Sequence, residues 1–164
     1  MNFDDEGLQN AIKSLVPDAD FSVNRSGELA WSDPRDKPSD AEIIAEAQRL
    51  QASSSAQAKL RRIAARRYEA ETAGTTMDGI AFDTDRQSQA LITGAALSAT
   101  RNPDYTVRWK TQAGPVTLDA DQLGAAADAV RDHVQACFDR EFELLDAVAD
   151  GTFKESMLEE GWPE

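Results

Sequence analysis

Five residues of this 164-residue chain have side chains that could do chemistry. Asp83 and Asp85 flank Thr84 and put two carboxylates two residues apart, a spacing compatible with calcium binding or acid–base work. A calcium loop of the EF-hand type needs further acids at alternate positions and a closing glutamate, but Arg86 and Gln87 follow here. Helix capping explains Asp83 and Thr84, so we predict no metal or cofactor site at this corner.

The other two reactive side chains are the single histidine and the single cysteine, His133 and Cys137. A catalytic histidine needs a nucleophile and a group that orients it, and the sequence contains no recognisable triad pattern. We expect His133 at the surface or half-buried on its helix, and Cys137 as a small buried hydrophobic residue. One cysteine forms no internal disulfide, and one histidine leaves no His/Cys cluster for a transition metal. The sequence therefore predicts that the chain is not an enzyme and holds no cofactor.

Charge and hydropathy exclude further classes of partner. The net charge is −13 and the pI is near 4.4, which argues against nucleic acid because phosphate binding needs a basic surface. A basic patch in the predicted long helix is expected to be solvated or to pair with the acidic second half; it contains Lys59, Arg61, Arg62, Arg66 and Arg67. Since no run of about 20 apolar residues occurs, we expect no membrane span. With an acidic N-terminus and no apolar leader, we expect the chain to be made in a reducing cytoplasm.

The elements that carry these residues begin with a small N-terminal module, residues 1–33. Residues 4–16 carry a helical stripe, and residues 21–31 alternate as an amphipathic hairpin that turns at Arg25-Ser26-Gly27. The module is too small to be stable alone, so its hairpin should dock on something through its apolar side chains, Phe21, Val23, Leu29 and Trp31. The proline-rich residues 34–38 are predicted to be a linker and the best domain boundary.

A long helix over residues 39–73 should follow, opened by a capping box of Ser39 and Glu42. Its apolar stripe changes phase after Ser53-Ser54-Ser55, which indicates a kink or a change of packing partner. Residues 74–152 then predict an α+β domain. We expect a hairpin turning at Asp78-Gly79, a helix over 84–100 opened by Thr84 and Gln87, and a second hairpin over 105–118 turning at 112–115. The strands should form one antiparallel sheet of three or four strands packed with two helices.

The last helix is predicted to start after a capping box of Asp119 and Gln122 and to reach Asp150. It carries a heptad seam that only Glu141 interrupts; the seam consists of Leu123, Ala127, Val130, Val134, Cys137, Leu144 and Val148. Two interpretations stay open. The seam packs against the 39–73 helix within one chain, or it joins copies of the chain into a homo-oligomeric bundle. Residues 153–164 are expected to be a loose acidic tail whose apolar side chains could anchor on a neighbour.

The order of several short motifs in residues 60–152 resembles an uncharacterised domain family encoded among the tail genes of tailed bacteriophages and prophages. The motifs are R-R-Y-E at 66–69, D-T-D-R-Q-S-Q at 83–89, W-K-T at 109–111 and H-V-Q-A-C at 133–137. The hairpin followed by W-S-D-P-R-D-K-P, within residues 8–45, more loosely resembles small phage tail-module proteins. The resemblance implies a place in a tail module and assigns no role to any residue.

From this resemblance we expect a virion protein, a structural component of a phage tail. It would act as an adaptor at or near the tail fibre or distal tail, with other tail or tail-fibre proteins and further copies of itself as partners. The alternative is a cytoplasmic chaperone of tail-fibre assembly that does not stay in the virion. Its acidic balance and small size suit either role.

Overall fold

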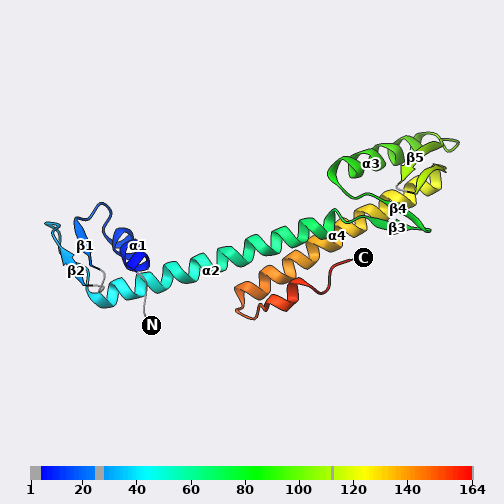
Figure 1. The fold of residues 1–164 in the computed structure, drawn as a ribbon. Coiled ribbons are helices and arrows are strands. Elements are labelled where there is room, and N and C mark those ends of the chain that lie inside the picture. The colour runs from blue at the N-terminus through cyan, green and yellow to red at the C-terminus, as the bar shows by residue number, and fades with distance from the viewer. Residues whose placement is uncertain (1–4, 25–27, 112, 164) are drawn as a thin grey trace. The chain divides into compact units, whose positions relative to one another are not determined.

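The computed structural model describes residues 5–24, 28–111 and 113–163. The chain divides into two compact units, Met1–Lys59 and Leu60–Glu164, and one helix contributes to both. The fold class is α+β, as predicted, because helices alternate with three antiparallel hairpins in the part of the chain that is described (Figure 1).

The first unit packs a helix and a hairpin on the start of the long helix. Helix α1 (Asp5–Leu15), strands β1 (Phe21–Val23) and β2 (Leu29–Trp31), and the first turns of α2 (Asp40–Glu71) surround one small core (Figure 1). That core consists of Ala11, Ile12, Ile43 and Ala47, with Leu8, Ala19, Phe21, Leu29, Trp31 and Leu50 packed around it. The predicted turn at 25–27 lies outside the described residues.

The segment at 34–38 is tied to the hairpin and does not separate the units. The indole N–H of Trp31 donates to the carbonyl of Arg35 at 2.8 Å, and the Arg35 guanidinium donates to Asp33 and to the carbonyl of Pro17. The hydrogen bonds that the Arg35 guanidinium and backbone N–H donate to Asp33 hold the pKa of the Asp33 carboxyl well below its usual range. The division between the units falls within α2, after Lys59, and not in the proline-rich segment predicted as the boundary.

Helix α2 runs without interruption through the three serines. Its predicted capping box is present, since the Glu42 carboxylate accepts from the N–H of Ser39 at 2.8 Å and the Ser39 hydroxyl accepts from the N–H of Glu42. Of the two explanations for the phase shift, a change of packing partner is the one observed. Ile43 and Ala47 belong to the core of the first unit, whereas Ile63 is buried against Leu144 and Leu158.

The second unit contains two hairpins and two further helices. The hairpins are β3 (Thr75–Met77) with β4 (Ile80–Phe82) and β5 (Val107–Thr111) with β6 (Gly114–Leu118); the helices are α3 (Arg86–Arg101) and α4 (Ala120–Ala149). Their core is Phe82, Ile92, Ala99, Leu118, Leu123, Ala126 and Val130. The two hairpins are separate two-stranded sheets, so the prediction of one sheet of three or four strands is wrong. Short strands that pack side by side on the same helices give the same apolar pattern as a hydrogen-bonded sheet.

Turn and cap residues explain most element boundaries of this unit. Asp78 and Gly79 both have positive φ, the geometry of the tight hairpin turn predicted for this pair. The capping box of Asp119 and Gln122 opens α4, also as predicted. Gln112 of the second predicted turn lies outside the described residues.

The prediction of Thr84 as the cap of α3 is wrong. Asp85 is the N-cap, and its carboxylate accepts from the N–H groups of Gln87 and Ser88. The adjacent threonine points into the interior and is fully buried. By sequence pattern, either Thr84 or Asp85 could be the N-cap, because both are polar residues just before the helix. Thr84 is buried, which leaves Asp85 to cap the helix.

The end of the chain is not a loose tail. Residues Glu155–Leu158 form a short 3-10 helix, η1, and Leu158 is 4% exposed in a core with Ile63 and Leu144. Arg140 of α4 donates to the carbonyls of Met157 and Glu160, at 3.0 and 3.1 Å. The predicted anchoring of this segment therefore takes place on its own chain.

Candidate functional site

The predicted seam of α4 is mostly covered from within the chain. Leu123, Val130, Cys137 and Leu144, spaced seven residues apart, are buried, whereas Ala127, Val134 and Val148 are half-buried. Leu123 and Val130 contact the core under α3 and the hairpins, and Leu144 contacts α2 and η1. At its Leu144 end the seam packs on α2, as the intramolecular interpretation has it, whereas at its Leu123 and Val130 end it packs on α3 and the hairpins, a partner that neither interpretation included.

Glu141, the acid that interrupts the seam, belongs to a buried ion network around Arg67 of α2. The Arg67 guanidinium pairs with the carboxylates of Glu71 and Glu141, the latter at 3.4 Å, and lies over the ring of Phe138 at 4.7 Å. The side chains of Arg67, Glu71 and Glu141 are 17%, 8% and 14% exposed, so all three charges are largely withdrawn from water. The network joins α2 to α4 at the position where the apolar seam is broken.

Two more residues of the basic patch on α2, Arg62 and Arg66, also meet the C-terminal part of the chain. Arg62 pairs with Glu155 of η1, and the Arg66 guanidinium lies 5.4 Å from the ring centre of Trp162. This pairing was one of the two predictions for the patch. These basic side chains therefore fix the C-terminal segment on the helix.

His133 and Cys137 lie next to each other in the interior. His133 is 5% exposed, not at the surface or half-buried as predicted, and its Nε2 lies 3.0 Å from the carbonyl oxygen of Ala70. The Sγ of Cys137 is 3.9 Å from the same nitrogen. Burial raises the pKa of the Cys137 thiol to about 11, with the Glu71 carboxylate adding to the rise. A thiol held protonated in this way is the opposite of an activated nucleophile.

The acidic corner at 83–85 has a structural role. The Thr84 hydroxyl donates to the carbonyl of Glu71 and accepts from the N–H of Gly74 at 2.9 Å, which satisfies the end of α2. The Asp85 carboxylate, besides capping α3, accepts from the Ser88 hydroxyl at 2.6 Å, and these bonds lower its pKa. Thr84 and Asp85 thus join the end of α2 to the start of α3. Within the described residues, no group of three or more His, Cys, Asp or Glu side chains could hold a metal ion.

The predicted docking face of the first unit is partly occupied by its own chain. The rings of Phe21 and Trp31 stack at 6.3 Å and pack on the core below them. Val23 and Leu29 line a hollow of about 460 Å³ beside α1 and α2, whose other apolar walls are Leu8, Ile12, Ile43 and Ile44. Of the four side chains predicted to dock, Val23 and Leu29 therefore border a hollow that is open to solvent.

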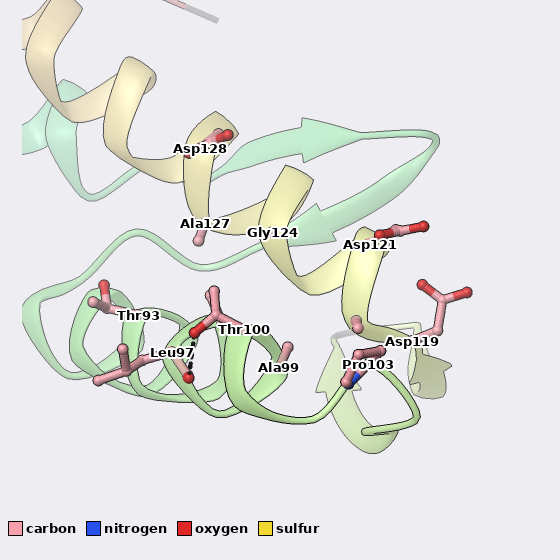
Figure 2. A pocket seen from close by; sticks show the side chains of 12 residues that line it. Thr93, Leu97, Ala99, Thr100, Pro103, Asp119, Asp121, Gly124, Ala127 and Asp128 are labelled. Carbon is pink, nitrogen blue, oxygen red and sulfur yellow. Dashed lines mark hydrogen bonds between the residues drawn. The ribbon is translucent and has the colours of Figure 1, made fainter.

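A larger groove lies between α3 and the first turns of α4 (Figure 2). Its volume is about 790 Å³. The α3 wall carries Thr93, Ala96, Leu97, Ala99 and Thr100, and the α4 wall carries Ala120, Asp121, Gly124, Ala127 and Asp128; Pro103 and Asp119 close one end. Leu97 is 55% exposed, so more than half of this large apolar residue is left uncovered by the described chain. We call this surface the α3–α4 groove.

The lining of the α3–α4 groove is mostly apolar and its charge is acidic. Its walls combine alanines, Gly124 and Leu97 with two threonines, and its charged side chains are three aspartates with no lysine or arginine among the lining residues. Asp119 is partly engaged by the N–H of Gln122, and Asp128 pairs with Arg131 at 2.7 Å. Sequence reasoning did not find this groove, although the helix-interior glycine Gly124, which lines it, gave a signal, since glycine weakens a helix unless something requires it.

Comparison with known proteins gives one family and no relative of known activity. A family described as a domain of unknown function, DUF4376, matches residues 54–160, more than half of the chain. No curated protein and no solved structure matches the chain. Among the described residues, no helix is both long and apolar enough to cross a bilayer.

Proposed function

The chain belongs to the DUF4376 family, and we propose that it is a structural component of the tail of a tailed bacteriophage. In this role it is an adaptor at or near the tail fibre or the distal tail, and it works in the virion after synthesis in the host cytoplasm. Its partners are other tail or tail-fibre proteins and further copies of itself. It has no catalytic role, and it binds neither nucleic acid nor membrane.

The observation that carries the proposal is the division of a short chain into two compact units with separate cores. An adaptor has to present two separate binding surfaces, and each unit here has an open hollow of its own. The open positions carry exposed apolar side chains, Ile44 in the first unit and Leu97 in the second. The motif order at 66–137 that resembles phage tail-gene products supports the location.

The test is fractionation of a phage or prophage that encodes the chain. Mass spectrometry of gradient-purified particles should detect the protein at a constant amount per particle. A chaperone of fibre assembly would instead co-purify with immature fibres from the lysate and be absent from the particles. That second pattern would remove the structural role and leave the chaperone as the function.

A further inference from the structure

We propose that the α3–α4 groove binds a helix of a partner protein, one that turns small apolar residues toward the groove and basic residues toward its aspartates. The identity of that partner as a tail protein rests on the proposed function. The chemistry of the groove rests on its own residues.

The two walls have the spacing that a third helix requires. On α4 the lining positions 120, 121, 124, 127 and 128 follow the i, i+4, i+7 rows of one helix face, and positions 93, 96, 97 and 100 do so on α3. Two adjacent helices with such rows leave a groove into which the side chains of a third helix fit. Figure 2 shows Thr93, Leu97 and Thr100 on α3 and Gly124, Ala127 and Asp128 on α4.

Gly124 leaves the α4 wall open to close approach. A Cβ built at Gly124 would meet no atom of the chain within 4 Å, so the space beside this glycine is free of the chain's own atoms. With Ala96 and Ala127 also lining the groove, the small side chains allow a second backbone to come close.

Charge decides which helix fits. The charged side chains that line the groove are Asp119, Asp121 and Asp128. Asp119 caps α4 and Asp128 pairs with Arg131, which also pairs with Asp132, so the surface around these residues keeps a net negative charge. The surrounding chain reinforces this field, because residues 74–164 hold seven Lys/Arg against seventeen Asp/Glu. Such a field attracts lysine and arginine and repels acidic segments, and it acts less strongly at high salt.

The proposal is tested with the purified full chain and a fluorescein-labelled synthetic helix. One probe has alanine and leucine on one face and lysine on the other; the matched probe has glutamate in place of lysine. Fluorescence anisotropy should show saturable binding of the lysine probe that weakens as salt rises, and no binding of the glutamate probe. If neither probe binds, or both bind alike, the proposal is overturned.

Two pairs of variants place the binding in the groove. Gly124→Leu should raise the melting temperature and weaken lysine-probe binding by at least about tenfold, whereas Gly94→Leu, on the neighbouring helix outside the groove, should leave binding unchanged. Leu97→Lys should also abolish binding, and Leu91→Lys, at a side chain of nearly equal exposure outside the groove, should not. Equal loss of binding within either pair would overturn the proposal.

This experiment is independent of the proposed function. Detection of the protein in virions without binding of the lysine probe would sink the groove proposal alone. Binding of the probe by a protein that is absent from virions would sink the structural role alone.

Discussion

Thr84 provides the sharpest test of how the second unit is held together. Its hydroxyl satisfies two backbone groups at once, the carbonyl of Glu71 and the N–H of Gly74. The substitution Thr84→Val keeps the shape of the side chain and removes both bonds. Since the residue is fully buried, water cannot replace them without disrupting the packing around it.

The size of the effect follows from those two backbone groups. Each buried backbone group left without a partner destabilises the fold by about 1–3 kcal/mol, and the added valine methyl offsets part of this. We therefore expect Thr84→Val to lower the free energy of unfolding of the second unit by about 2–4 kcal/mol. Thr84→Ser retains the hydroxyl and removes one methyl, so it should destabilise by only about 1 kcal/mol. Asp85→Ala, which removes the true N-cap of α3, should also destabilise by about 1 kcal/mol.

The assay has to separate the two units, because a chain with two cores does not unfold as one two-state transition. Hydrogen exchange followed by mass spectrometry on peptides that contain Phe82 and Ile92 reports the second unit, and peptides that contain Ile12 report the first. Thr84→Val should speed exchange in the former and leave the latter unchanged. A valine variant no less stable than the serine variant would refute the assignment of the hydroxyl as the link between α2 and α3.

Three further predictions concern the buried groups of the second unit. Arg67→Met removes the partner of two largely buried carboxylates and should destabilise by about 3–5 kcal/mol in urea unfolding; an effect below that of Glu141→Gln would contradict the ion network. Leu158→Ala should destabilise by about 2–5 kcal/mol, and no change in melting temperature would mean that η1 is not anchored. The folded-state pKa of Cys137 is raised from 9.0 to about 11, so its contribution is present below pH 9 and disappears as pH rises toward 11. The free energy of unfolding of the wild type should therefore fall between pH 9 and pH 11 relative to that of Cys137→Ala. If the two proteins show the same dependence of stability on pH, the pKa of the thiol is not raised in the folded state.

Local signals in the sequence were enough to predict the α-helices and hairpins of the fold, but not the short helix η1. Proline, glycine and the capping residues place the helices and hairpins within a few positions, and Asp78-Gly79, Ser39 and Asp119 act as predicted. The seven-residue spacing of Leu123, Val130, Cys137 and Leu144 correctly indicated a buried stripe. These features depend only on residues close together in the chain.

Contacts between distant segments could not be predicted in the same way. The sequence pattern shows Glu141 only as an interruption of the seam, because its partner Arg67 lies more than 70 positions earlier in the chain. Thr84 looked like a cap because its partner, the carbonyl of Glu71, becomes available only when α2 ends there. The α3–α4 groove depends on how two helices pack, and neither helix alone indicates it.

The central claim, that the chain is a structural part of a phage tail, is tested most directly by its copy number in purified particles. Isotope-labelled peptides of this chain and of an abundant tail protein from the same phage would give that number by mass spectrometry. If the chain is a structural part of the tail, the ratio between the two proteins is the same in every gradient fraction that contains intact tails. A ratio that falls toward zero as the particles are purified would contradict it.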